Sequence, residues 1–195
     1  STEDAFAFLD DVKSFSDPII ILTGGEPMMR DDIYDIAAYG TSLGLRMVMA
    51  PCGLLVTEEL AQKMKDSGIM RVSLSIDGLT AEQHNNFRRV EGAFESVMKA
   101  IENFKKVGME FQVNTTITKH NVKDLPKLLE LVIKLGAVAS IEAGPAALRL
   151  ARRANVPLLV TATGTIDNGN VSANQLQVLL QGVGECLIDN VEVSR

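Results

Sequence analysis

Short apolar runs alternate along the chain with longer segments in which apolar residues recur at helical spacing. The apolar runs predict strands at residues 18–23, 45–50, 70–76, 109–118 and 137–142. The segments that precede and separate these runs predict helices at residues 3–15, from Asp31 or Asp32 to Leu43, and at residues 57–66, 92–107 and 122–135. A strand that is apolar throughout, as at 18–23, is typical of a parallel sheet covered on both faces. Repeated βα units predict an α/β fold, a partial or completed parallel βα barrel.

The alternation continues towards the C-terminal end of the chain. It predicts helices at 145–154 and at about 172–182, and strands at 156–161 and near 185–193. Because every predicted helix after the first lies between two strands, we expect one βα-barrel-like domain over residues 1–195.

Polar residues and glycines at the predicted helix ends support these boundaries. Thr2 and Thr57 are suitable N-caps, since a threonine hydroxyl accepts a hydrogen bond from a free backbone N–H of the first turn. Gly44 and Gly136 stand where a helix commonly ends in the left-handed conformation that glycine adopts without strain.

The first strand runs directly into Gly24-Gly25-Glu26-Pro27. The two glycines leave the backbone bare where a ligand approaches, and Pro27 favours an extended Glu26. A carboxylate at the carboxyl end of a parallel strand suits a ligand that carries an ammonium group. The alternative is a tight turn between strand and helix.

This element, followed by Arg30-Asp31-Asp32 and a helix, resembles the S-adenosylmethionine contact motif of the radical SAM enzymes. The resemblance covers roughly residues 1–138 and continues in order through further motifs, namely residues 45–53, 72–78, 84–94 and 113–118. Residues 139–195 match no family pattern and read as additional βα units of unknown origin, either a graft that makes the chain a chimera or an unusual natural tail.

The resemblance implies roles for individual residues. Glu26, with the backbone of Gly24 and Gly25 and with Pro27, would meet the amino group of S-adenosylmethionine. Ser75 and Asp77 lie two residues apart at a strand end, where the family holds the ribose or the carboxylate of that cofactor. The alternative for Asp77 is a simple Asp77-Gly78 turn.

Two further polar positions have two readings each. Asn114 lies within an apolar strand and would contact S-adenosylmethionine or satisfy a neighbouring backbone group. Arg88 or Arg89 would pair with the cofactor's carboxylate, although a surface salt bridge is expected for at least one of them.

The cysteines do not match the family. Radical SAM enzymes hold a [4Fe–4S] cluster on a Cys-x3-Cys-x2-Cys loop ahead of the Gly-Gly-Glu-Pro element, whereas this chain has two cysteines, Cys52 and Cys186, far apart in sequence. The [4Fe–4S] cluster expected of the family therefore lacks its ligands here, and we assign no catalytic or metal-binding residue. Cys52 is expected to be buried, the alternative being a contact to a cluster or substrate, and Cys186 is expected in the core. Unpaired cysteines fit a reducing cytoplasm.

Other polar motifs carry weaker signals. His84 and His120 have no ligands at metal spacing and are read as exposed loop residues. Residues 167–170 are read as a polar turn rather than a calcium loop, and the glycine-poor threonine cluster around Thr163 is a weak phosphate-binding candidate.

Charge and composition exclude some partners. The chain has 195 residues, 46% of them hydrophobic, and a net charge of −6, which argues against a nucleic-acid surface. No apolar run is long enough to span a membrane. A small-molecule or peptide substrate is expected, and self-association through open sheet edges is possible.

The sequence therefore predicts a protein that binds S-adenosylmethionine and is similar to the radical SAM maturases of peptides or tetrapyrroles. Since the cluster-binding cysteines are missing, this stretch alone is not expected to perform radical chemistry. One alternative is a catalytically inert, truncated or recombined βα scaffold. Another is an anion- or nucleotide-binding α/β module that uses the loops at Gly24 and Thr163.

Overall fold

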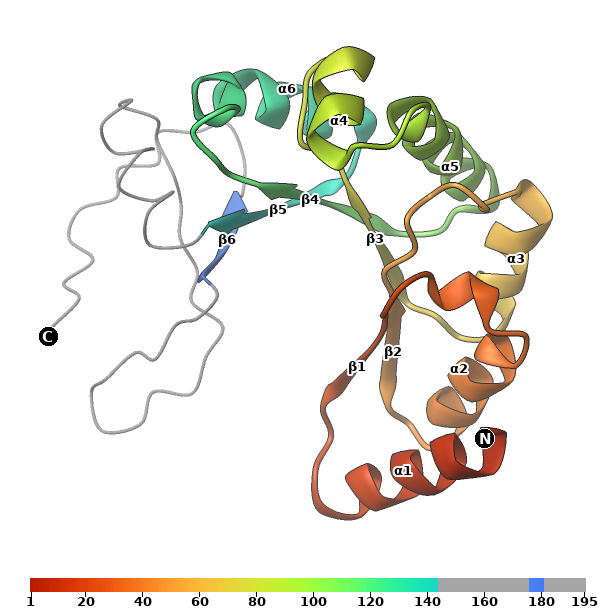
Figure 1. The fold of residues 1–195 in the computed structure, drawn as a ribbon. Coiled ribbons are helices and arrows are strands. Elements are labelled where there is room, and N and C mark those ends of the chain that lie inside the picture. Colours follow the sequence, from red (N-terminus) through yellow and green to blue (C-terminus); the bar gives the residue numbers. More distant parts are fainter. Residues whose placement is uncertain (144–175, 181–195) are drawn as a thin grey trace, which may run out of the picture. The chain divides into compact units, whose positions relative to one another are not determined.

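Helices and strands alternate in the computed structural model, which describes residues 1–143 and 176–180 (Figure 1). The first half contains α1 (Thr2–Phe15), β1 (Ile19–Leu22), η1 (Pro27–Met29), α2 (Ile33–Ser42), β2 (Arg46–Met49), α3 (Glu58–Asp66) and β3 (Arg71–Ser75). The second half contains α4 (Ala81–Arg88), α5 (Ala93–Val107), β4 (Phe111–Thr116), η2 (Val122–Asp124), α6 (Leu125–Leu135), β5 (Val138–Ala143) and β6 (Leu176–Leu180). This succession confirms the predicted α/β class with repeated βα units.

The sheet has the strand order β1-β2-β3-β4-β5-β6. Strands β1, β2 and β3 are parallel neighbours, with Ile19 opposite Arg46 and Val48 opposite Arg71. Their carboxyl ends consequently point the same way, which is the condition for loops after successive strands to meet.

The chain divides into two compact units. Unit 1 comprises Ser1–Ser75 and Val90–Gln112, and unit 2 comprises Ile76–Arg89 and the chain from Val113. The expected single domain over residues 1–195, with additional βα units after residue 138, stays a prediction.

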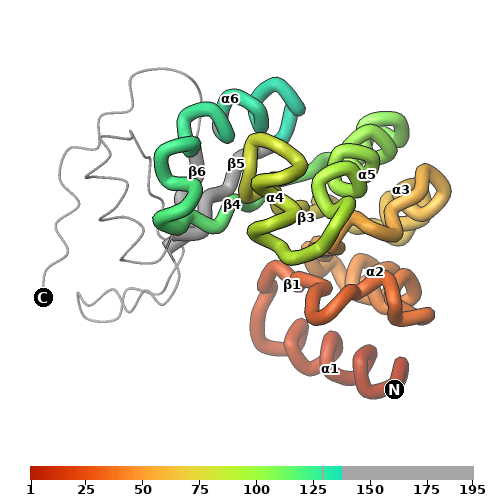
Figure 2. Tube along the Cα trace, turned by 45° about the horizontal axis from the view of Figure 1, so that its top comes forward, coloured from red at the N-terminus to blue at the C-terminus, as the bar shows by residue number. Residues whose placement is uncertain are grey.

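Unit 1 places its helices on one side of β1, β2 and β3 (Figures 1 and 2). Alternate strand residues follow this arrangement, because Met47 and Met49 are fully buried while Arg46 is exposed. The core beside β1 consists of Leu9, Ile36, Leu45 and Met47.

Strand β1 departs from its prediction as a strand buried on both faces. Ile20 and Leu22 pack against the core, but Ile19 and Ile21 are 55% and 59% exposed. The helices of unit 1 cover only one face of the strand, so the sequence run overstated its burial.

The helix caps are confirmed in part. Thr57 caps α3 by accepting a hydrogen bond from the N–H of Leu60, as predicted. The N-cap of α1 is Ser1 rather than Thr2, because Ser1 forms a reciprocal capping box with Asp4. Gly44 and Gly136 follow their helices with φ angles of +77° and +74°, as predicted for C-terminal glycines.

Helix α4 is missing from the sequence prediction. Its residues are almost all polar, so no apolar periodicity marks it, but Thr80 caps it through the N–H of Gln83. Its buried residue is His84, at 1% exposure, and the prediction of an exposed loop histidine is therefore wrong for His84. The exposure predicted for His120 is confirmed.

Strand β6 replaces the central part of the helix predicted at about 172–182. Leu176–Leu180 pairs antiparallel with β5, with Ala139 opposite Leu180. An apolar run of this length is compatible with either a buried helix or a strand, and a partner distant in sequence decided for the strand. The other predictions beyond residue 143, including those for Thr163, residues 167–170 and Cys186, lie outside the described residues.

Candidate functional site

The loop after β1 exposes bare backbone. Gly24 has a φ of +131°, a region that side chains other than hydrogen rarely allow, and both Gly24 and Gly25 are exposed. A Cβ atom built on either glycine would have no described atom within 4 Å, leaving aside its chain neighbours. The predicted open approach to this backbone is therefore present.

Glu26 is held by the backbone on both sides of its carboxylate. Oε1 accepts a hydrogen bond from the N–H of Met28 at 3.1 Å, and Oε2 accepts one from the N–H of Cys52 at 2.7 Å. The first bond caps η1, and buried Pro27 begins that helix. Each carboxylate oxygen has two acceptor positions, so Glu26 retains the capacity to accept from an ammonium group.

Cys52 lies in the loop after β2 and is exposed, so the prediction that it is buried is wrong. Its neighbours Pro51 and Gly53 are buried instead, which leaves the side chain between them facing solvent. Partial burial of the sulfur raises the pKa of the Cys52 thiol, and its hydrogen bond to Glu26 raises that pKa further. The thiol therefore stays protonated beside the carboxylate at neutral pH.

Tyr34 is a residue of this region that the sequence reasoning missed. Its ring is buried in α2, with Lys63 Nζ 4.5 Å from the ring centroid, and its hydroxyl has no hydrogen-bond partner among the described residues. Burial, followed by the charge of Glu26, raises the pKa of Tyr34. The signal was available, since a tyrosine on the apolar face of a predicted helix brings a hydroxyl that requires a partner.

Ser75 is the last residue of β3 and is partly buried. Within the described part of the chain, its hydroxyl has no hydrogen-bond partner. Of the predicted site residues, Gly24, Gly25, Glu26, Pro27 and Ser75 thus all belong to unit 1.

Asp77 in unit 2 is the centre of a buried network. Its carboxylate forms an ion pair with Arg88 Nε at 2.5 Å and accepts the N–H of Thr116 at 2.8 Å. Its own N–H donates to His84 Nδ1 at 3.1 Å, and its carbonyl accepts from Asn121 Nδ2 at 3.1 Å. Asp77 therefore joins α4 to the end of β4 within unit 2.

Asp77 and Arg88, which were both predicted to contact S-adenosylmethionine, pair with each other in this network. The side chain of Asp77 is fully buried, whereas that of Arg88 is 37% exposed. The alternative expectation of a salt bridge is confirmed for Arg88, although its partner is buried rather than at the surface. Cofactor binding by Asp77 and Arg88 stays a prediction.

Asn114 lies in β4 and is partly buried. Its carbonyl accepts the N–H of Ile76 at 3.0 Å, which links β4 to the residue after β3. Asp77, Arg88 and Asn114 form a second group of predicted residues, within unit 2. Contact of the Asn114 side chain with S-adenosylmethionine stays a prediction.

No group of three or more His, Cys, Asp or Glu side chains in residues 1–143 and 176–180 is arranged to hold a metal ion. Over the same ranges, no helix has the length and apolar character needed to cross a membrane.

Curated relatives match the same part of the chain. The AdoMet-dependent heme synthase of Methanosarcina barkeri is 48% identical over 139 residues, which are 71% of this chain and 40% of that protein. The Fe-coproporphyrin III synthase of the same organism is 38% identical over 132 residues, covering 68% of this chain and 33% of that protein. The chain thus spans well under half the length of these relatives.

Solved structures resemble the fold. Streptococcus suis SuiB bound to S-adenosylmethionine superposes with a TM-score of 0.63 at 18% identity, covering 72% of this chain and 33% of that one. The anSMEcpe enzyme with bound AdoMet gives a TM-score of 0.61 at 18% identity, covering 85% of this chain and 45% of that one. These likenesses confirm the α/β fold with βα units in a partial barrel.

The sequence profile of the radical SAM superfamily matches residues 1–132, about two thirds of the chain. The expected resemblance is therefore confirmed, and the chain belongs to the radical SAM superfamily.

Proposed function

We propose that this chain is the S-adenosylmethionine-binding part of a radical SAM enzyme that acts on a tetrapyrrole. The observation that carries the proposal is the Glu26 carboxylate, held by the N–H groups of Met28 and Cys52 beside the open backbone of Gly24 and Gly25. The tetrapyrrole is suggested by relatives named heme synthase and Fe-coproporphyrin III synthase.

Glu26 suits the ammonium group of the methionine portion of S-adenosylmethionine. Its two backbone hydrogen bonds fix the carboxylate before a ligand arrives, so little side-chain entropy is lost on binding. A charge-assisted hydrogen bond of this kind contributes about 1.5–3 kcal/mol. The open space beside Gly24 and Gly25 allows the ligand to approach the backbone closely.

Ser75 is the second residue of unit 1 assigned to the cofactor. Its hydroxyl stands at the carboxyl end of β3 without a partner among the described residues, so it is available to a ribose hydroxyl or a carboxylate. S-adenosylmethionine supplies radical chemistry in this family, and the residues assigned here bind and orient it.

A [4Fe–4S] cluster does not fit the residues of this chain. The cluster needs closely spaced thiolates, and the sequence contains only Cys52 and the distant Cys186. The second candidate is a βα scaffold that keeps the family fold without its activity.

Calorimetric titration of S-adenosylmethionine into the Glu26→Gln variant tests the proposal. Loss of the carboxylate charge should weaken binding by about tenfold or more, because the ammonium loses its charge-assisted partner. Glu59→Gln is the matched control, since Glu59 is exposed in the first turn of α3 and the charge change is the same.

The outcome separates the two candidates. Binding that Glu26→Gln weakens and Glu59→Gln leaves unchanged supports the proposed function. Failure of the unsubstituted chain to bind S-adenosylmethionine would favour the inert scaffold.

A further inference from the structure

The face of β1, β2 and β3 opposite the unit 1 helices carries exposed apolar residues around an arginine. Ile19 and Ile21 are both more than half exposed, and Val48 is partly buried. The strand register places Ile19 opposite Arg46 and Ile21 opposite Val48. Residues opposite each other in neighbouring strands share a face, so these side chains form one patch. We call Ile19, Ile21, Arg46 and Val48 the sheet-face patch.

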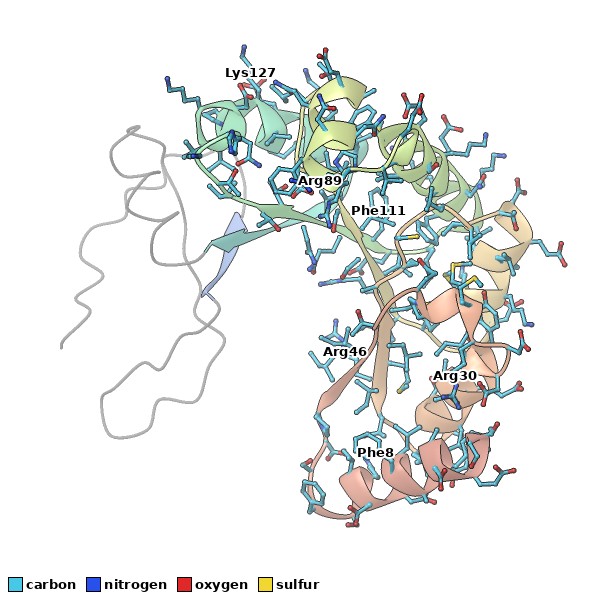
Figure 3. All side chains as sticks on the ribbon, viewed as in Figure 1. Phe8, Arg30, Arg46, Arg89, Phe111 and Lys127 are labelled. Atoms are coloured by element: carbon cyan, nitrogen blue, oxygen red, sulfur yellow. The ribbon has the colours of Figure 1, made fainter. Side chains whose placement is uncertain are left out.

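Arg46 is the unusual member of the patch. Its side chain is exposed, and no described residue forms a hydrogen bond or ion pair with its guanidinium group. Figure 3 shows its side chain on the side of β2 away from α2 and α3. The next arginine on this face, Arg71 opposite Val48, is already paired with Glu110. The Arg46 guanidinium is thus a cation that remains available to a ligand.

This combination selects a particular ligand chemistry. Branched aliphatic side chains favour an apolar surface, and a guanidinium group binds a carboxylate through two parallel hydrogen bonds. A nucleic acid is disfavoured because the chain carries a net charge of −6 and the patch offers a single free cation among its described residues. A flat apolar ring with carboxylates at its rim satisfies both features.

The sheet-face patch and the Glu26 loop both belong to unit 1 and lie close enough for one ligand to reach from the patch towards the loop. Arg46 is the first residue of β2 and Met49 the last, which separates Arg46 from the carboxyl end of the strand by roughly 10 Å at about 3.3 Å per residue. The loop after that end contributes Cys52, whose N–H holds Glu26. A ring ligand with several carboxylates at its rim is able to place one at Arg46 while another part lies nearer the strand ends.

We propose that the sheet-face patch binds the tetrapyrrole substrate and that Arg46 pairs with one of its carboxylates. This inference rests on the proposed function, because the tetrapyrrole is taken from it. The unpaired guanidinium group of Arg46 beside Ile19 and Val48 is the observation that assigns Arg46 to substrate binding.

Fluorescence titration with metal-free coproporphyrin III tests the inference. Arg46→Gln should weaken binding by about tenfold or more, because a charged hydrogen-bonding partner is lost. Arg46→Lys keeps the charge but cannot form two parallel hydrogen bonds with a carboxylate. Its affinity for the porphyrin should therefore lie between those of the unsubstituted chain and Arg46→Gln. Lys127→Gln is the matched control: it makes the same change in net charge at an exposed position on α6 (Figure 3) and should leave affinity unchanged.

A second probe isolates the carboxylate. Coproporphyrin III with all its carboxylates converted to amides should bind the unsubstituted chain and Arg46→Gln equally well. The inference is overturned if the acid does not bind the unsubstituted chain, if Arg46→Gln retains full affinity, or if the amide binds the unsubstituted chain as tightly as the acid.

S-adenosylmethionine titrations on the same samples distinguish this inference from the proposed function. Arg46→Gln should bind S-adenosylmethionine like the unsubstituted chain, which also shows that the variant is folded. Retained S-adenosylmethionine binding with no Arg46 dependence of porphyrin binding would reject the role of Arg46 and leave the role of Glu26 standing.

Discussion

The two glycines before Glu26 place different demands on the backbone, although both border open space. Gly24 has a φ of +131°, whereas Gly25 is absent from the glycines with positive φ. If a Cβ atom were added to either glycine, no atom of a described residue would lie within 4 Å of it, apart from those of the adjacent residues in the chain. Substitution at Gly24 therefore strains the chain, while substitution at Gly25 only fills space that a ligand would use.

This difference predicts that an alanine at Gly25 mainly affects ligand binding, whereas an alanine at Gly24 mainly affects stability. Gly25→Ala should change the free energy of unfolding by no more than about 0.5 kcal/mol, as for other surface substitutions, yet weaken S-adenosylmethionine binding. Gly24→Ala should lower the free energy of unfolding by about 1–3 kcal/mol because of its backbone conformation. Denaturant unfolding and calorimetric titration measure the two effects. Unchanged affinity in Gly25→Ala would show that no ligand approaches this backbone.

Among the elements, the start of α2 is joined to α1 by an acidic side chain. Asp32 is the N-cap of α2 but makes no capping hydrogen bond. Its carboxylate instead accepts hydrogen bonds from Arg30 Nε and Nη2 at 2.5 and 2.8 Å and from Thr2 Oγ1 at 2.5 Å. The hydrogen bonds from Arg30, and then from Thr2, lower the pKa of Asp32 to about 2.

The shift predicts a pH dependence with a definite sign. Because the folded-state pKa lies below the ordinary value of 3.8, Asp32 stabilises the fold above that value and loses this contribution as the pH falls towards about 2. In Asp32→Asn, the free energy of unfolding should fall less over this interval than in the unsubstituted chain. Urea unfolding across the interval measures the slope, with exposed Asp31→Asn as control. An identical slope in Asp32→Asn would contradict the assignment.

Some of the helices and strands are predictable from sequence and others are not. Helices α3, α5 and α6 have apolar periodicity together with Thr57, Gly108 or Gly136 at an end, so pattern and cap agree. Helix α4 has a cap but no apolar periodicity, and it is held by Asp77 through His84 and Arg88. Strand β6 depends on pairing with β5, which no local pattern contains.

Across the whole molecule, ordered motifs predicted the superfamily, but they predicted the site only in part. The bare glycines and the position of Glu26 follow from neighbouring residues. The bond from Cys52 to Glu26 spans 26 positions, and those joining Thr116 and Asn121 to Asp77 span 39 and 44. Such contacts form only when loops after different strands meet, so the exposure of Cys52 and the network around Asp77 could not be derived from sequence.

Glu26 is the residue that we propose to hold the amino group of S-adenosylmethionine. The most direct measurement is a calorimetric titration of the unsubstituted chain with S-adenosylmethionine and with its analogue that lacks the α-amino group. We predict that the affinity for the analogue is lower by about tenfold or more, because the charge-assisted hydrogen bond to the carboxylate is lost. Equal affinities for the two compounds would contradict the claim and remove Glu26 from the cofactor site.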